Sequence, residues 1–360
     1  MKKLKETLSN KGIGSGYLYF YVHLITELVC FFMLARQIGD SPFLWTFPLI
    51  YDSLSFVPQS LFGYLSDKYP KIKMGIIGTF LLALAVLIFS TNLLPGKYTA
   101  IVILCIGNAL IHINGAEVTL RSSGGKLAPS AIFVAGGSFG VIIGKLLGKT
   151  LISYWLIILL ALTMIPFILL AEYYRNEADE KSINPCTKFN YHSLKIKPGT
   201  IVILAILIIL VRGYMGYGIP TTWKKTTIQA VILYFSMGIG KALGGILADT
   251  IGFKKTALIS AGLALPFLLF GDNLMLVSLI GVMFFSMTMA ITLGLLVSVL
   301  KHTPGLAFGL TTIGLFLGTL PIFFFKLTTT FANSVVITIL TILCLIVMSF
   351  IIRKDEKIDG

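Results

Sequence analysis

The sequence has little charge for its size. Only 12% of its 360 residues are Asp, Glu, Lys or Arg, and just 15 of them are acidic. A soluble domain carries about a quarter charged residues, so this chain lacks the polar surface that it would need in water. Apolar residues make up 56% of the chain, and the mean hydropathy is +0.92. The shortage of charge excludes an ordinary soluble protein and indicates one that lies in a membrane.

Cysteine is scarce as well, and the motifs of common enzymes are missing. The four cysteines show no ligand-like spacing and no disulfide framework. The chain contains no phosphate-binding loop of the ATPase type, no zinc-ligand pattern and no nucleophile elbow. The run "AGGSFG" at 135–140 resembles a dinucleotide loop, but it lies inside an apolar segment with no strand before it. We therefore expect no metal, no cofactor and no enzymatic activity.

What the sequence does contain is a series of apolar segments of about 20 residues, the length of helix that crosses a bilayer. We predict twelve membrane spans, at residues 16–36, 43–66, 74–94, 99–120, 129–149, 151–173, 199–219, 227–248, 255–271, 273–300, 304–326 and 331–352. The predicted fold class is an all-α polytopic membrane protein.

The basic residues mark one side of this predicted protein. The formal net charge is +14, and most of the 29 lysines and arginines fall on the cytoplasmic side if both termini are cytoplasmic. This is the positive-inside bias that sets orientation, and Trp45, Trp155 and Trp223 fall at the opposite ends of spans. We therefore expect a multi-pass protein of the plasma (cytoplasmic) membrane, with the lipid bilayer rather than nucleic acid as its partner.

Two polar stretches interrupt the apolar segments at equivalent places, "LFGYLSDKYPKIKMG" at 61–75 and "GGILADTIGFKKTA" at 244–257. Each lies between the second and third spans of a set of six, and the two are offset by 182 residues, about half the chain. The longest polar segment lies between the two sets. Such a repeat indicates two parallel six-helix bundles, 1–174 and 199–360, joined by a cytoplasmic linker at 175–198.

Both stretches resemble the signature loop of the major facilitator superfamily, G-x-x-x-D-(R/K)-x-G-(R/K)-(R/K). The second copy matches it at Gly245, Asp249, Gly252, Lys254 and Lys255, and the first at Gly63, Asp67, Lys68, Lys71 and Lys73. The first copy departs from the pattern at Pro70, where the family usually has glycine. The resemblance covers the whole chain and implies the major facilitator fold, with twelve helices in two bundles.

A second resemblance concerns residues 107–148, "GNALIHINGAEVTLRSSGGKLAPSAIFVAGGSFGVIIGKLLG", together with 49–63. These segments are similar to the fosmidomycin-resistance type of facilitator, whose members export a phosphonate antibiotic. The chain departs from that type at Ile113 and Lys145, where proline is usual. The fifth-helix proline belongs to an element associated with antiporters, so its absence at Lys145 weakens the efflux assignment.

The function that these resemblances imply is secondary active transport by alternating access. We expect proton-coupled export of a small drug-like or anionic, phosphonate-like solute by a monomer. The alternatives are proton-coupled uptake of a small organic anion and a transporter-shaped membrane receptor without flux.

The repeated glycine and aspartate can be explained physically as parts of a cytoplasmic gate. A glycine near the end of a span allows another helix to approach closely. A carboxylate at the membrane rim is stabilised by about 0.3–1 kcal/mol at the positive N-terminus of a helix, here expected in the other half. We expect the lysines Lys68, Lys71, Lys254 and Lys255 to add ion pairs to this gate. For the lysines the alternative is that they only set topology.

Ionisable groups inside a span are costly, so each needs a partner or a function. His23 and Glu27 share a face of the first span, and Asp52 lies near mid-depth of the second. The fourth span carries Asn108 and His112 on one side, and Asn114, Glu117 and Arg121 nearly opposite. We favour the Asn108–His112 side as the one that faces the central cavity, and we expect an ion pair between Glu117 and Arg121.

In facilitators the first, fourth and seventh spans line the cavity, which implies that the first two face Arg212 on the seventh. The predicted substrate or proton pathway therefore consists of His23, Glu27, Asp52, Asn108, His112 and Arg212, with the proton on Glu27, Asp52 or His112. A structural role stays open for each: a histidine can donate to a carbonyl, Asp52 can pack helices, and Arg212 can neutralise a carboxylate.

Overall fold

The structure is a computed structural model that describes residues 11–38, 46–181, 185–219, 221–324 and 330–353. Within these ranges the chain is almost entirely α-helical, with one 3-10 turn at Pro185–Lys188 and a single antiparallel bridge between His192 and Ile352. Lys2, Lys3, Lys5 and Trp45, which entered the topology prediction, lie outside the described residues. The predicted all-α fold class is confirmed.

The helices follow the predicted spans closely. They are α2 (Lys11–Ile38), α3 (Thr46–Phe56), α4 (Pro58–Lys68), α5 (Met74–Ser90), α6 (Leu94–Ser122), α7 (Ala128–Leu147), α8 (Tyr154–Leu162), α9 (Met164–Lys181), α10 (Pro198–Gly218), α11 (Thr227–Ile251), α12 (Phe253–Phe270), α13 (Met275–Val299), α14 (Pro304–Phe324) and α15 (Thr330–Ile351). Among the described residues, ten helical segments have the length and composition to cross a membrane, and Met74–Ser90 is a shorter apolar helix. Helices α3 and α4 overlap the second predicted span but are not among these ten segments.

Two predicted spans are broken into consecutive helices, and proline explains both breaks. Pro58 opens α4 directly after Val57, and Pro166 lies in the first turn of α9. Proline has no amide hydrogen, and its ring clashes with the carbonyl four residues earlier, so it disrupts a continuous helix. Both prolines were visible in the sequence, although the predicted spans ran straight through them.

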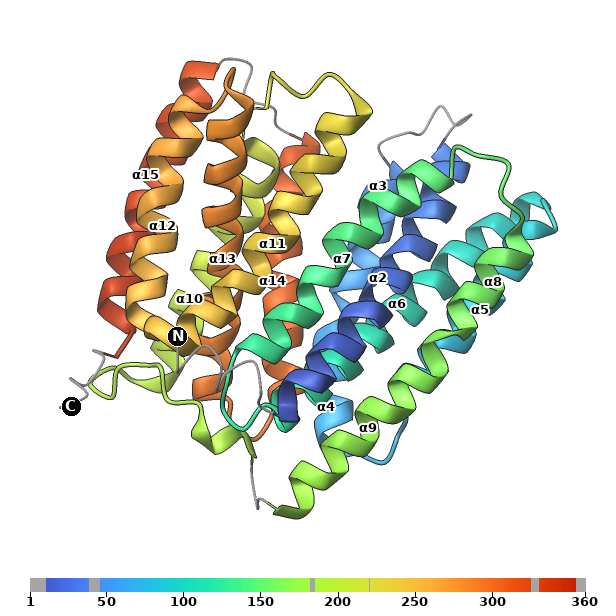
Figure 1. Cartoon of the computed structure of the whole chain (residues 1–360), viewed down its shortest axis with the longest axis horizontal. Coiled ribbons are helices and arrows are strands. Elements are labelled where there is room, and N and C mark those ends of the chain that lie inside the picture. Colours follow the sequence, from blue (N-terminus) through green and yellow to red (C-terminus); the bar gives the residue numbers. More distant parts are fainter. Residues whose placement is uncertain (1–10, 39–45, 182–184, 220, 325–329, 354–360) are drawn as a thin grey trace.

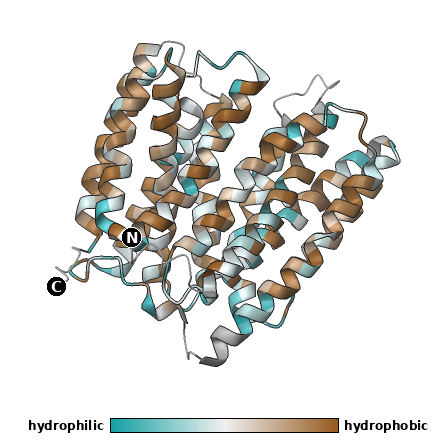
Figure 2. Cartoon of the chain, viewed as in Figure 1, coloured by the Kyte–Doolittle hydropathy of each residue, from teal (hydrophilic) through white to brown (hydrophobic). Residues whose placement is uncertain are grey.

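The helices gather in two groups that lie side by side (Figure 1). One contains α2 to α9 and the other α10 to α15. Apolar residues cover much of the outer helices (Figure 2), and large side chains such as Trp155, Ile203 and Ile346 are more than 60% exposed. An apolar exterior of this extent suits a surface that lies in lipid.

Glycines set the closest helix contacts in both groups. A Cβ at Gly136, Gly140 or Gly144 of α7 would collide with successive backbone carbonyls of α2. In the other group, a Cβ at Gly240 or Gly244 of α11 would collide with carbonyls of α13. Small residues allow helix backbones to touch in this way. The α2–α7 contact fixes the rotation of α2 and so determines where its polar side chains point.

The linker begins later than the sequence predicted. Helix α9 continues past residue 175 to Lys181, because "NEADEK" is polar and contains good helix formers that continue the helix beyond the apolar segment. Farther along, the Tyr191 carbonyl accepts a hydrogen bond from the Arg353 amide at 2.8 Å, and the Tyr191 ring stacks on Phe253 with centroids 4.1 Å apart. The linker therefore packs against the end of the second helix group.

Candidate functional site

The first signature carboxylate connects the two helix groups. Asp67, near the end of α4, accepts hydrogen bonds from the Gly305 amide at 3.1 Å and the Leu306 amide at 2.8 Å. These are the first free amides of α14. A Cβ at Gly63 would collide with the Gly305 carbonyl, so glycine is what allows the helices to meet here. We call this contact the amino latch.

The second signature carboxylate makes the same contact in reverse. Asp249, near the end of α11, accepts from the Leu127 amide at 2.9 Å and the Ala128 amide at 2.8 Å, at the start of α7. Gly245 lies against the Leu127 carbonyl and the Ala131 methyl group, with no space for a side chain. We call this contact the carboxy latch. Each carboxylate lies at a helix N-terminus of the other half, the position that the sequence predicted, where the helix dipole favours negative charge.

The signature lysines do not form the expected ion pairs. The Lys68 ammonium lies 5.4 Å from the ring centroid of Tyr69, and the Lys254 ammonium donates to the Ser349 carbonyl at 3.3 Å. Among the described residues, no ion pair involves Lys68, Lys71, Lys254 or Lys255. Lys68, Lys71 and Lys255 are exposed and Lys254 is half-buried, and an ion pair at an exposed position contributes little. Setting topology remains the role that the sequence predicts for them.

An arginine from the fourth span provides the ion pair instead. Arg121 Nη2 lies 3.5 Å from Asp67 Oδ1, and Arg121 Nε lies 2.9 Å from Glu117 Oε1. Arg175 joins the network, 3.8 Å from Glu117 and 3.0 Å from Glu172. The local Glu117–Arg121 pair was expected, whereas its connection to Asp67 and Arg175 was not. The i,i+3 spacing of Glu172 and Arg175 was the sequence feature that could have indicated that Arg175 takes part in this network.

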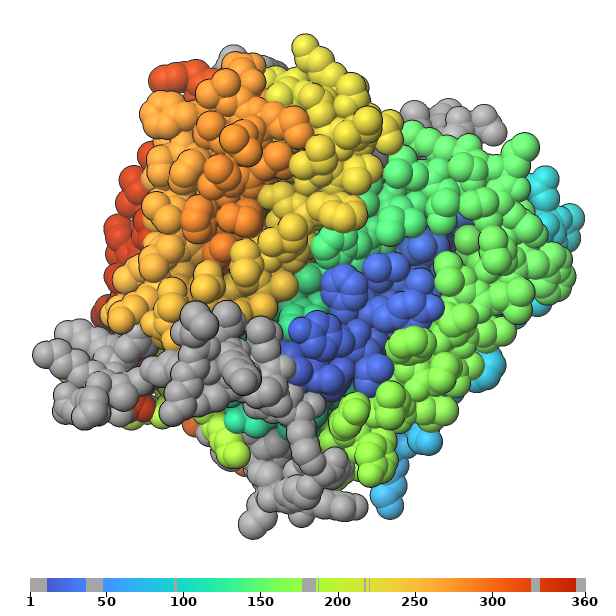
Figure 3. Space-filling model, in the orientation of Figure 1, coloured from blue at the N-terminus to red at the C-terminus, as the bar shows by residue number. Residues whose placement is uncertain are grey.

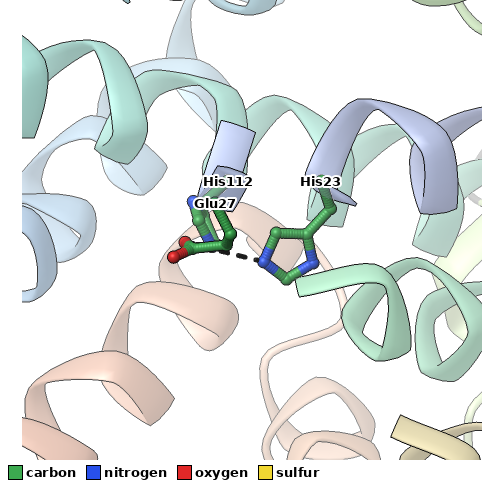
Figure 4. A group of neighbouring side chains, drawn as sticks. All are labelled: His23, Glu27 and His112. Atoms are coloured by element: carbon green, nitrogen blue, oxygen red, sulfur yellow. Dashed lines mark ion pairs between the residues drawn. The ribbon is translucent and has the colours of Figure 1, made fainter. Parts of the chain in front are cut away.

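A separate polar cluster lies on α2 and α6 and contains His23, Glu27 and His112 (Figure 4). Glu27 Oε1 lies 3.4 Å from His112 Nε2 and 3.8 Å from His23 Nε2. The Asn108 amide group donates to Glu27 Oε1 at 3.0 Å. All four side chains are buried, with residue exposures of 7% or less. The structure thus brings the Asn108–His112 side of the fourth span onto Glu27.

Tyr51 belongs to the same cluster and was not predicted from the sequence. Its hydroxyl lies 3.5 Å from Glu27 Oε2 and 3.0 Å from the Asn108 amide nitrogen. A tyrosine inside an apolar span carries no pattern that distinguishes a site residue from a packing residue. Asp52, the neighbour of Tyr51, is buried but has no ion pair with another described residue.

Arg212 lines a narrow cavity between the two halves together with Lys241. The other lining residues come from α7, α13 and α14, including Ser130, Thr292 and Phe308. Arg212 donates to the Thr292 hydroxyl at 3.0 Å, while its Nε is buried without a hydrogen-bond partner. Among the described residues, neither cation has a carboxylate within ion-pair distance. In this conformation Glu27 is therefore held by its own half and does not neutralise Arg212.

Lys145, the residue that stands where the resembled type has proline, makes a contact with α11. Its ammonium donates to the Tyr234 hydroxyl at 2.9 Å. It also lies 5.1 Å from the ring centroid of Phe31. Since Tyr234 is on α11, this contact joins the two halves, and Figure 3 shows α11 against α7 on one face of the molecule. An aromatic and hydroxyl environment offers the ammonium a partner without a carboxylate.

Comparisons with known proteins agree with this fold. No family model matches the chain. The Escherichia coli K12 fosmidomycin resistance protein is 26% identical over 280 residues, covering 69% of this chain and 64% of that protein. The chain thus matches slightly less than two thirds of the length of that curated relative.

Two solved structures share the arrangement of helices. The human organic anion transporter MFSD10 (TETRAN) superposes with a TM-score of 0.60 at 13% identity, covering 96% of this chain and 99% of that one. The transporter FucP in the outward conformation superposes with a TM-score of 0.61 at 12% identity, covering 94% and 98%. The chain has the major facilitator fold. The repeated signature loop and the curated relative are features in which the chain resembles members of the major facilitator superfamily.

Proposed function

We propose that the chain is a secondary active transporter that exports a small organic anion, phosphonate-like or drug-like, in exchange for protons. The observation that carries the proposal is the pair of cations, Arg212 and Lys241, on one cavity between the two halves, with no carboxylate within ion-pair distance among the described residues. A charge inside the membrane requires a negative partner or a functional role. An anionic substrate supplies that partner.

The cavity is built so that its occupant contacts both halves. Arg212 and Lys241 come from α10 and α11, while Ser130, Ala131 and Val134 come from α7. A ligand that binds residues of both halves has a different affinity for each relative placement of them, and this is what lets a ligand shift a conformational equilibrium. The guanidinium of Arg212 suits a carboxylate or phosphonate, which it can bind through two parallel hydrogen bonds.

The two latches supply the second element of alternating access. Both hold the halves together at the end where the sequence predicts the cytoplasm, with both termini on the same side. In the proposed cycle, the latches break when the cavity opens to the cytoplasm and re-form when it opens outward. The two helix groups, divided at 175–198, would move as units about the central cavity, within a single chain.

Asp52 is the proposed proton carrier. It is buried on α3 and has no ion pair to break among the described residues, so it can take up and release a proton without disrupting a structural contact. The charged groups that act on it are Glu27 on α2 and Lys145 on α7, and the Cys105 thiol on α6 is also close. Asp52→Asn should abolish gradient-driven transport but preserve substrate exchange, because only the proton-linked step is removed.

Transport in proteoliposomes tests the proposal directly. Purified protein is reconstituted, a pH gradient is imposed, and movement of phosphonates, monocarboxylates and cationic drugs is followed in both directions. We expect anion movement driven by the gradient and loss of binding in Arg212→Gln. Lys224→Gln removes the same charge at an exposed loop position and serves as the control. Binding without flux would favour a receptor, and absence of any anion binding would overturn the proposal.

A further inference from the structure

Three potential metal-ligand atoms converge in the buried cluster of α2 and α6. One ligand atom from each of His23, Glu27 and His112 lies within 4.8 Å of the other two. Figure 4 shows the three side chains close to one another. We propose that they form a binding site for one divalent transition-metal cation of the zinc class. This site goes beyond the proposed transport function, and the sequence analysis expected no metal at all.

The hydrogen bonds of the two histidines decide which nitrogen faces Glu27. His23 Nδ1 lies 2.9 Å from the Phe133 carbonyl, and His112 Nδ1 lies 2.9 Å from the Asn108 carbonyl. A carbonyl oxygen only accepts, so both Nδ1 atoms must carry the proton. In the neutral rings, both Nε2 atoms then present lone pairs toward a carboxylate. Metal-binding histidines are held in this way, with the other nitrogen donating to a carbonyl.

Two lone pairs directed at a carboxylate repel it unless a proton or a metal cation lies between each of them and the oxygen atoms. One proton can serve a single histidine–carboxylate contact and leaves the second lone pair facing an oxygen atom. One divalent cation can bond all three atoms and balance the carboxylate charge at the same time. Zinc bonds imidazole nitrogen and carboxylate oxygen at about 2.0–2.2 Å, which places tetrahedral ligands about 3.4 Å apart. The His112–Glu27 separation of 3.4 Å matches this value, and the His23–Glu27 separation of 3.8 Å needs only a small rotation.

The surroundings of the cluster hold these ligands in place. Asn108 donates to Glu27 Oε1 at 3.0 Å, and the Tyr51 hydroxyl lies 3.5 Å from the other carboxylate oxygen. The Asn108 carbonyl oxygen of the side chain is itself buried without a partner. A Cβ at Gly137 would collide with His23 Nε2, so glycine leaves this nitrogen accessible. Hydrogen-bonded partners around the ligands are a regular part of a metal site.

Metal titration of the full-length protein in detergent tests this site without any transport substrate. The protein is stripped with a chelator, freed of any histidine tag, and titrated with Zn²⁺ by calorimetry and with Co²⁺ by visible absorption. We expect one ion per chain and a Co²⁺ spectrum typical of tetrahedral nitrogen and oxygen ligands. Because the spectrum comes from the unmodified protein, it remains informative even if a variant fails to fold.

Variants then assign the ligands. His112→Asn and Glu27→Gln should each weaken metal binding by far more than tenfold, and Asn108→Ala by about tenfold, as expected for a residue that only orients a ligand. His302→Asn changes an exposed loop histidine and should leave binding unchanged. Absence of stoichiometric Co²⁺ binding by the unmodified protein would overturn the proposal, as would full binding by His112→Asn. Neither result bears on the anion test at Arg212, so the two proposals fail separately.

Discussion

The amino and carboxy latches make the same contact but have different supports. In each, a carboxylate at the end of one helix accepts two amides at the start of a helix in the other half, at 2.8–3.1 Å. Asp67 is supported by a partly buried network of Arg121, Glu117 and Arg175. Beside the carboxy latch, the linker packs Tyr191 on Phe253. The two copies of the repeat therefore make the same contact between the halves, but different neighbouring residues stabilise each copy.

The difference indicates that the latches respond to different conditions. A network of charges depends on every partner, because the loss of one leaves another charge buried and unpaired. An aromatic stack contributes about 0.5–1.5 kcal/mol and does not depend on salt in the same way. We expect the amino latch to be the more sensitive to substitution and the carboxy latch to depend on the position of the linker.

Removal of both latch carboxylates should have the largest effect. The double variant Asp67→Ala with Asp249→Ala loses four hydrogen bonds to charged acceptors, each worth about 1.5–3 kcal/mol. We expect transport turnover in proteoliposomes to fall by about tenfold or more, with normal membrane insertion and a monodisperse protein. Turnover close to that of the unmodified protein would contradict the gate assignment. The two single variants show whether the latches contribute equally.

The next largest effect is expected for the loss of Arg121, which distinguishes the amino latch from the carboxy latch. Arg121→Gln leaves Glu117 buried beside Ser66 without its strongest partner, and breaking a buried ion pair costs about 3–5 kcal/mol at most. Thermal unfolding in detergent should show a clearly lowered midpoint. Adding Glu117→Gln should restore part of the stability, because Glu117 is then no longer a buried charge without its partner, whereas Asp67 still lacks Arg121. An unchanged midpoint in the single variant would show that the network does not support the amino latch.

A methyl group at Gly63 should separate the halves without removing any charge. Gly63→Ala places Cβ against the Gly305 backbone, which cannot move aside as a flexible side chain can. We expect a shift toward the conformation that is open at the latch end, measured as a longer distance between spin labels on α4 and α14. Gly262→Ala, where nothing lies within 4 Å, is the matched helical control. Equal label distances in both variants would refute the steric account.

The smallest predicted effect is a pH dependence beside the carboxy latch. His192 lies in the linker, and its Nδ1 is 3.0 Å from the Ser298 hydroxyl. Burial lowers the pKa of His192, and the positive charges of Lys301 and Arg353 lower this pKa further. A lowered pKa means that the unfolded chain binds the proton more readily, so stability should fall as the pH drops below about 6.5. His192→Gln should flatten thermal stability over this range. A profile identical to that of the unmodified protein would assign the dependence to other groups.

Much of the fold followed from the sequence because membrane spans are local features. Length and apolar composition locate each helix, and the basic residues between helices predict the orientation. The latch contacts at Asp67 and Asp249 were also predictable, since a repeated glycine–aspartate pair at a helix end requires a close neighbour and a positive partner. The prolines Pro58 and Pro166 indicated the two helix breaks in the sequence, but the predicted spans did not take them into account.

Which side chains meet in the candidate site was decided by the tertiary structure. Composition shows that Glu27, His112 and Arg212 lie within spans, but not how each helix is rotated about its axis or which neighbour it meets. Glycine packing between α2 and α7 turns Glu27 toward Asn108 and His112, and helix packing in the other half brings Lys241 beside Arg212. The sequence by itself determined the all-helical class and the approximate position of each apolar helix. Side-chain packing between helices distant in the chain decided which charges meet, because that rotation depends on contacts that no single span encodes.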